Sequence, residues 1–93
     1  MNRLLFVVED TFDIPERGVV AAPGIIPEDD ECFRIGDRLR VKRPDGSSLD
    51  TSIASLELLS PNPTRAVVVM FPKDISKSDI PAGSEVWSNM DIG

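Results

Sequence analysis

The chain has 93 residues, 41% of them hydrophobic and 28% charged, with a net charge of −6 and no histidine. These values are typical of one folded domain, and they argue against disorder. The missing histidine excludes Ser/His/Asp and Cys/His catalysis, and the acidic balance disfavours nucleic acid, which binds basic faces. We therefore expect a single domain over residues 1–93, with a core at about 4–87 and a flexible tail at 88–93.

Short apolar runs predict the first strands. Leu4–Val8 and Ala66–Phe71 are continuous and rich in β-branched residues, which favours buried strands over helices. A third strand is expected over Arg17–Ala22, after a loop at Phe12–Glu16. The run at Leu4–Val8 is too short for a signal-peptide core or a membrane span, so we expect a cytoplasmic protein without membrane contact.

The clearest hairpin is predicted between residues 38 and 59. Arg38–Lys42 alternates polar and apolar residues, which places Leu39 and Val41 inward. Pro44–Ser47 has the Pro, Asp and Gly that tight turns require. The return strand follows that turn.

The return strand changes its hydrophobic phase. Leu49, Thr51 and Ile53 fall on one phase, whereas Leu56 and Leu58 fall on the other. A strand of period two cannot change faces without an irregularity. The phase change predicts a bulge or bend near Ala54–Ser55.

The remaining segments complete an all-β prediction. Asp74–Asp79 is short and polar and predicts a single helical turn, and Glu85–Trp87 predicts a last strand. Prolines near the strand boundaries fit many short strands. We expect a small closed antiparallel β-barrel of about six or more strands, because closure removes exposed sheet edges.

Sites for metals and cofactors are not predicted. A single cysteine, Cys32, can anchor neither zinc nor a disulfide within the chain, and we expect an inert thiol rather than a reactive one. Glu28–Glu31 could hold a hard cation, but a solvated acidic loop is the favoured interpretation. No phosphate-binding loop motif occurs, so we expect no cofactor.

Two charged groups are candidates for function. Arg38, Arg40 and Lys42 share one strand face and could bind phosphate or an acidic partner, although a solvated face is the simpler interpretation. Glu9 and Asp10 could act as a carboxylate pair in acid–base chemistry. Since no convergent partner accompanies them, we expect no enzyme activity.

Four segments resemble domain 2 of elongation factor Tu and its relatives, in the family's order and near its spacing. The first, Leu4–Val20, contains an apolar strand, Glu-Asp-x-Phe and an Ile-Pro-x-Arg-Gly turn. The others are Ile35–Asp37, Thr51–Leu56 and Ile75–Gly83. The resemblance covers about residues 4–87. It implies a closed, mainly antiparallel barrel that stands alone, without the family's GTPase domain.

The resemblance implies that only part of the family's aminoacyl pocket is present in this chain. Glu9, Asp10 and Phe12 match its Glu-Asp-x-Phe segment. Ala22 stands where the family has threonine, and Ala54 where it has the pocket glutamate. Leu56 replaces an aromatic residue, Glu16 a glycine, and Pro23 interrupts the usual Thr-Gly.

We expect a non-catalytic binding or adaptor module whose target is a protein. It would act as a translation-factor mimic or modulator, or as an immunity-type inhibitor. Two alternatives stay open: recognition of an aminoacylated transfer RNA or RNA end, and a detached subunit of a separately encoded translation GTPase. The sequence leaves the oligomeric state open. The candidate partner contacts are Glu9, Asp10, Phe12, Arg17, Arg38, Arg40 and Lys42.

The segment around Phe12 also has a purely structural interpretation. Phe12, Ile14 and Arg17 would then fasten the connection between the first two strands rather than touch a partner. Phe71 and Trp87 are expected to pack in the core or at the barrel rim rather than to stack on bases.

Overall fold

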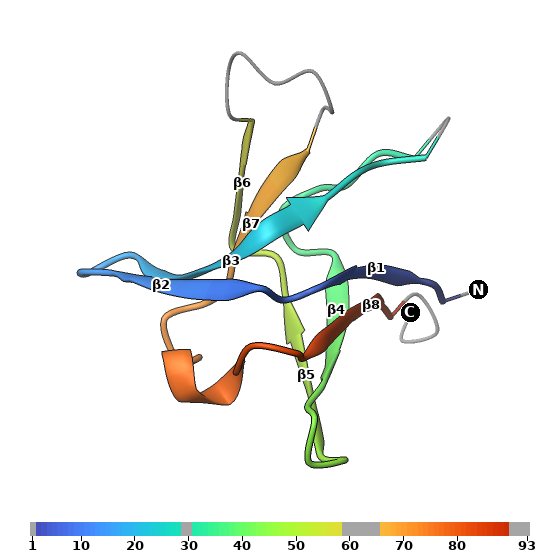
Figure 1. Ribbon diagram of the computed structural model, residues 1–93. Coiled ribbons are helices and arrows are strands. Elements are labelled where there is room, and N and C mark those ends of the chain that lie inside the picture. The colour runs from blue at the N-terminus through green and yellow to red at the C-terminus, as the bar shows by residue number, and fades with distance from the viewer. Residues whose placement is uncertain (1, 29–30, 59–65, 90–93) are drawn as a thin grey trace.

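The computed structural model describes residues 2–28, 31–58 and 66–89 (Figure 1). These residues form β-strands and one short 3-10 turn, and no helix among them has the length and apolar content to cross a bilayer. The strands are β1 Leu4–Val7, β2 Asp10–Ile14, β3 Gly18–Ile25, β4 Arg38–Lys42, β5 Ser48–Ser52, β6 Ser55–Leu58, β7 Val67–Met70 and β8 Glu85–Ser88, and the 3-10 turn η1 is Lys77–Asp79.

The strands form two four-stranded antiparallel sheets. One has the order β1-β8-β4-β5 and the other the order β2-β3-β7-β6. In Figure 1, β3, β6 and β7 lie in the upper part of the view and β4, β5 and β8 in the lower part, with β1 and β2 running between them. The all-β, antiparallel prediction is therefore confirmed at the level of two sheets.

The chain passes from one sheet to the other between β1 and β2. At Val8 the backbone N–H donates to the carbonyl of Ser84 at 2.8 Å, beside β8. The next N–H, that of Glu9, donates to the carbonyl of Ala22 in β3 at 2.9 Å. Consecutive residues thus take their partners from different sheets.

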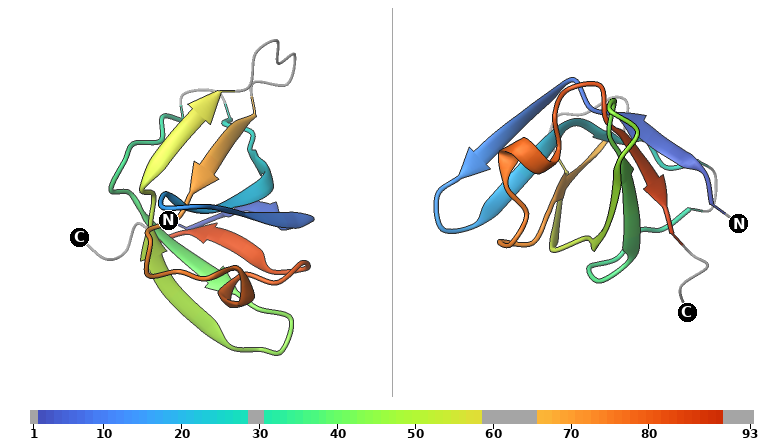
Figure 2. Two further views of the ribbon diagram at one scale, coloured as in Figure 1. Left: turned by 90° about the vertical axis from the view of Figure 1, so that its left-hand side faces the viewer. Right: turned by 90° about the horizontal axis from the view of Figure 1, so that it is seen from below.

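The chain passes between the sheets a second time from β5 to β6. The N–H of Ile53 donates to the Asp37 carbonyl at 2.9 Å, and the N–H of Ala54 donates to the Met70 carbonyl in β7 at 2.9 Å. The predicted bend near Ala54–Ser55 is confirmed at this crossing. Figure 2 shows how these connections join the two sheets.

Both sheets contribute side chains to one buried core. The β1-β8-β4-β5 sheet supplies Leu39, Val41 and Val86, each at most 1% exposed. The other sheet supplies Ala21 and Val69, both fully buried. The core is mainly aliphatic; the cluster comprises Leu5, Phe6, Val8, Ala21, Ile25, Leu39, Val41, Ile53, Val69, Phe71, Ile75, Ile80 and Val86.

The local predictions for the hairpin and the helical turn are confirmed. β4 and β5 pair from Arg38 opposite Ser52 to Lys42 opposite Ser48. Gly46 in the turn has a φ of +93°, a conformation that glycine adopts without strain. The turn η1 lies within the predicted segment 74–79.

The predicted loop at Phe12–Glu16 is wrong for most of its length. Asp10–Ile14 is strand β2, paired with β3 from Asp10 opposite Ala22 to Ile14 opposite Gly18. Here Thr11 is buried and Phe12 is exposed, so the polar residue faces the core and the aromatic residue faces solvent. This inverted alternation conceals the strand from a hydrophobic pattern.

Two predictions at the ends of the chain are corrected. The first strand is not buried throughout, because Leu4 and Val7 are exposed and an irregularity between Leu4 and Phe6 shifts the register. The proposed tail at 88–93 starts too early, because Ser88 belongs to β8 and Asn89 is 2% exposed. Residues 90–93 lie outside the described residues.

An ionic clamp joins the start of the chain to the segment before β4. Arg3 Nε donates to Glu31 Oε2 at 2.6 Å, and Arg3 Nη2 donates to the other carboxylate oxygen. Glu28 Oε1 lies 3.6 Å from Arg3 Nε. The hydrogen bonds from Arg3 hold the pKa of Glu31 below its ordinary value of 4.5. The clamp therefore requires an ionised Glu31.

We predict that Ser84→Ala raises the free energy of unfolding by about 1 kcal/mol, because a buried unpaired hydroxyl is costly. Ser84 is fully buried, and its Oγ has no hydrogen-bond partner among the described residues. Ser88→Ala is the matched control: Ser88 Oγ accepts from Arg3 N–H at 2.9 Å, so this variant should lose about as much. Thermal unfolding measures the stability of both variants. If Ser84→Ala is less stable than the wild type, the Ser84 hydroxyl is not a buried group without a partner.

We predict that the stability advantage of the wild type over Glu31→Gln depends on pH. The pKa of Glu31 is lower in the folded state, so its contribution is complete above about pH 4.5 and is lost as the pH falls through the folded-state value. Urea unfolding between about pH 7 and pH 3 should show the two proteins converging at low pH. Glu16→Gln is the control, and a constant difference across this range contradicts the prediction.

Candidate functional site

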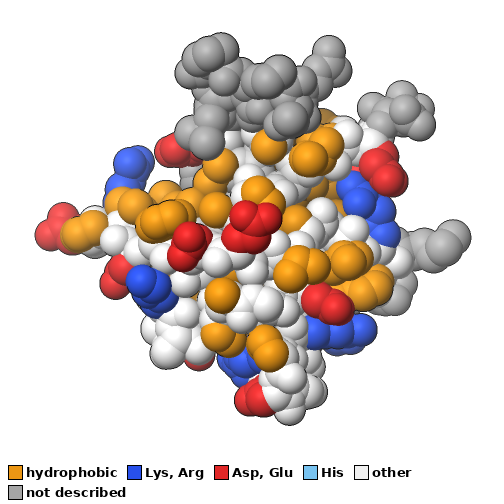
Figure 3. All heavy atoms as spheres, in the orientation of Figure 1, with side chains coloured by type: hydrophobic (Ala, Val, Ile, Leu, Met, Phe, Trp, Pro, Cys, Tyr) orange, Lys and Arg blue, Asp and Glu red, His pale blue; other side chains and the backbone are white. Residues whose placement is uncertain are grey.

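An apolar hollow opens on the outer face of the β2-β3-β7-β6 sheet. Its volume is about 320 Å³, and most of its lining comes from three neighbouring strands. We call its six apolar residues the apolar face: Phe12, Ile14, Val20, Ala22, Val68 and Met70. In Figure 3, hydrophobic side chains gather along β2 at the left of the view, with acidic side chains beside them.

Strand alternation explains why these side chains share one face. Val19 and Ala21 of β3 are buried in the core, so Val20 and Ala22 between them point outward. The pairing register then aligns Phe12 with Val20, and Val20 with Met70. The apolar face is therefore fixed by the register of the sheet and not by a flexible loop.

The side chains of the apolar face differ in depth. Met70 is 8% exposed, whereas Phe12 is 50% exposed. Met70 lies in the inner strand β7 and forms part of the floor, and Phe12 lies on the edge strand β2 and forms a wall. A half-exposed phenylalanine beside a concave apolar floor is a typical contact for a partner side chain.

A close backbone approach shapes the floor near Ala22. Gly24 has a φ of +101°, and a Cβ at this position would lie 2.5 Å from the carbonyl oxygen of Val67. The register of β3 against β7 also shifts between Ala21 and Ile25. Glycine is thus required where β3 passes over the start of β7.

Charged side chains surround the apolar face. Glu57 and Arg17 line the hollow themselves. Asp10 is two residues before Phe12 on β2 and lies opposite Ala22, so it points to the same face. Asp10, Glu57 and Arg17 have no ion-pair partner within the described part of the chain. The hollow is therefore apolar in its centre and charged at its margin.

The structure brings together three of the seven predicted contact residues. Phe12 and Arg17 line the hollow, and Asp10 adjoins it. Glu9 is exposed at the crossing, where its N–H bonds to Ala22. Asp10, Phe12 and Arg17 therefore lie at one site, although Phe12 belongs to a strand and not to the predicted loop.

Two positions that the resemblance assigns to a pocket lie elsewhere. Ala54 is exposed at the β5–β6 crossing and does not line the hollow. Leu56 is partly buried and packs against the core. Of the three replaced pocket positions, Ala22 alone lies in the hollow.

The predicted basic residues lie on the other sheet, where two of the three contact other side chains. Arg40 Nε donates to Asp50 Oδ1 at 2.7 Å, and these hydrogen bonds lower the pKa of Asp50. Lys42 Nζ lies 4.6 Å from the centre of the Trp87 ring, a cation–π contact. Arg38 is exposed at the start of the same strand. These interactions favour the interpretation of a solvated strand face.

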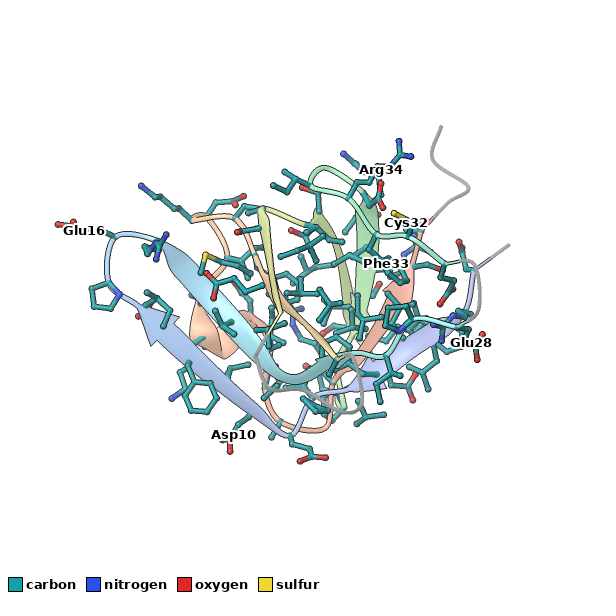
Figure 4. The ribbon with its side chains drawn as sticks, turned by 90° about the horizontal axis from the view of Figure 1, so that it is seen from above. Asp10, Glu16, Glu28, Cys32, Phe33 and Arg34 are labelled. Carbon is teal, nitrogen blue, oxygen red and sulfur yellow. The ribbon has the colours of Figure 1, made fainter. Side chains whose placement is uncertain are left out.

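The described residues of the acidic run and the cysteine lie away from the apolar face. Glu28 and Glu31 contact Arg3, and Asp29 and Asp30 fall outside the described residues. Cys32 is exposed. Figure 4 shows Glu28 and Cys32 on the side of the molecule away from Glu16. Among the described residues, no group of three or more Cys, Asp or Glu converges on a point that could hold a metal.

Several residues of the hollow are not predicted from the sequence. Val68 and Met70 belong to the apolar run 66–71, which reads as buried on both faces, so its outward side chains give no signal. Glu57 is an isolated charge in the return strand. Its place at the hollow depends on the pairing of β6 with β7, which the hydrophobic pattern does not specify.

A scan against protein-family models and searches of curated proteins and of solved structures gave no match to the chain. The site is therefore interpreted from its own geometry and chemistry.

Proposed function

We propose that the chain is a non-catalytic binding module that docks a protein partner on the apolar face. The observation that carries the proposal is the 50% exposed Phe12 beside a hollow of about 320 Å³. This volume is at the lower end of the roughly 300–1,000 Å³ found for ligand pockets. It suits one or two apolar side chains of a partner rather than a large cofactor.

The groups that line the hollow support binding rather than catalysis. General acid–base chemistry needs groups that converge on the reacting atoms. Arg17 and Glu57 are the charged residues that line the hollow, and no hydrogen bond or ion pair joins them within the described part of the chain. The sequence also offers no histidine to take their place.

The proposal includes a closed barrel of the kind found in domain 2 of translation GTPases. The two crossings support it, because β1 continues into β2 and β5 continues into β6. Following these continuous strands, the neighbours run β8, β4, β5–β6, β7, β3 and β2–β1, and then return to β8. If the chain forms such a barrel, we propose that it acts as a mimic or modulator of a translation factor.

Recognition of an RNA end is the weaker alternative. The margin of the hollow carries the carboxylates of Asp10 and Glu57 and the single guanidinium of Arg17. Phosphate binding draws its affinity from several cations. An electrophoretic shift assay with aminoacylated transfer RNA at low salt tests this alternative, and we expect no shift.

Barrel closure predicts slow hydrogen exchange at both crossings. If the barrel is closed, the amides of Val8, Glu9, Ile53 and Ala54 open only with the core strands, because each donates to a backbone carbonyl. Their protection should match that of Val41 and Val69 within about tenfold. Exchange at these four amides as fast as in an exposed turn contradicts closure.

Partner binding should depend on Phe12. Phe12→Ser removes the exposed wall of the hollow, and we expect it to weaken binding by at least about tenfold, since one apolar anchor is worth roughly 1.5–3 kcal/mol. The measurement is affinity purification from the native cell, followed by calorimetric titration of the purified partner.

Val7→Ser is the matched control for Phe12→Ser. Val7 is 45% exposed and lies on β1, which belongs to the other sheet. This variant should bind the partner like the wild type. Equal binding of the partner by Phe12→Ser and by the wild type contradicts the proposed function.

A further inference from the structure

We propose that the segment docked on the apolar face is basic and amphipathic: an apolar side chain enters the hollow, and an adjacent lysine or arginine contacts Asp10 or Glu57. The inference rests on the proposed function and specifies the chemistry of its partner. The net charge of −6 agrees with a basic target, but the local arrangement of charges carries the argument.

Charged side chains are paired on one sheet, whereas the two carboxylates at the apolar face are not paired within the described residues. On the other sheet, Arg40 binds Asp50, and Arg43 Nη2 lies 3.6 Å from Asp79 Oδ1. At the apolar face, Asp10 and Glu57 lack any such cation in the described portions of the chain. When a partner binds, water leaves the apolar surface beside these carboxylates. A carboxylate that loses water needs a cation nearby, and here the partner must supply it.

Both carboxylates lie close to the hollow. Asp10 and Phe12 are two residues apart on one face of β2, which corresponds to about 7 Å along the strand. Glu57 lies opposite Val68, whose side chain lines the hollow. An apolar side chain in the hollow therefore brings a neighbouring lysine or arginine of the same segment within reach of a carboxylate.

Charge repulsion disfavours a second copy of the chain as the occupant of the apolar face. Two copies meeting face to face through this surface would bring the carboxylates of one copy toward those of the other, and each chain carries a net charge of −6. Like charges brought together at an interface oppose association. Each copy has one cation at the hollow, Arg17, and two carboxylates, Asp10 and Glu57. The single positive charge of Arg17 does not balance the two negative charges.

The test uses two fluorescent peptides and the full chain. One peptide has leucine and phenylalanine at its centre with a lysine on each side, and the matched peptide has glutamates in place of the lysines. Both are acetylated and amidated, so that no terminal charge contributes. Fluorescence anisotropy measures the affinity of each peptide for the wild type, for Phe12→Ser and for the double variant Asp10→Lys/Glu57→Lys.

We expect the wild type to bind the lysine peptide about tenfold more tightly than the glutamate peptide. Phe12→Ser should weaken the lysine peptide, and the double variant should abolish or reverse the preference. Raising the salt concentration should reduce the preference, because exposed charge pairs are screened. Circular dichroism and thermal unfolding confirm that both variants fold.

Three results overturn the inference. If the wild type binds both peptides with equal affinity, the partner segment need not be basic. If the double variant keeps the preference for the lysine peptide, that preference comes from residues other than Asp10 and Glu57. If the lysine peptide does not bind but the native partner still requires Phe12, the inference that the partner segment is basic is wrong, whereas the proposed function stands. The proposed function fails separately, when the native partner binds Phe12→Ser as it binds the wild type.

Discussion

The whole architecture depends on two points where a strand exchanges one set of hydrogen-bond partners for another. At Val8–Glu9 and at Ile53–Ala54, the first N–H donates to a carbonyl just before β8 or β4, and the next N–H donates to a carbonyl of β3 or β7 in the other sheet. Buried backbone groups must be paired, so these bonds fix where each strand leaves its first sheet and joins the second. The two sheets are thereby held around one aliphatic core, and the outer face of each sheet is left to solvent.

The two outer faces differ in the way their charges are satisfied. On the β1-β8-β4-β5 sheet, cations and carboxylates contact each other, as in the pair Arg40–Asp50, or an aromatic ring, as Lys42 does with Trp87. On the β2-β3-β7-β6 sheet, the centre is apolar and concave. Complementary charges within one face leave little to attract a partner, whereas an apolar hollow with a charged margin is typical of a recognition surface.

The sequence predicts those parts of the fold that depend on local patterns. The alternation of Arg38–Lys42, the turn at Gly46 and the phase change before Leu56 specify the hairpin and the second crossing. β2 is missed because Thr11 faces the core and Phe12 faces solvent. A hydrophobic pattern cannot identify a strand whose apolar residue lies outside.

The site is predicted in part for a related reason. The resemblance to a translation-factor barrel domain draws attention to Asp10, Phe12 and Arg17, which are close in sequence. Val68, Met70 and Glu57 join them through pairings between distant strands, β3 with β7 and β6 with β7. Such long-range registers are set by the packing of the whole core, so the floor of the hollow could not be read from the chain alone.

Titration of the isotopically labelled full chain with its purified partner, followed by two-dimensional NMR, tests the central claim most directly. The account predicts that amide shifts concentrate on β2, β3 and β7 around Phe12, Val20 and Val68, while β4 and β5 stay unperturbed. Shifts centred on Arg40 and Asp50, with β2 and β7 unchanged, would contradict it.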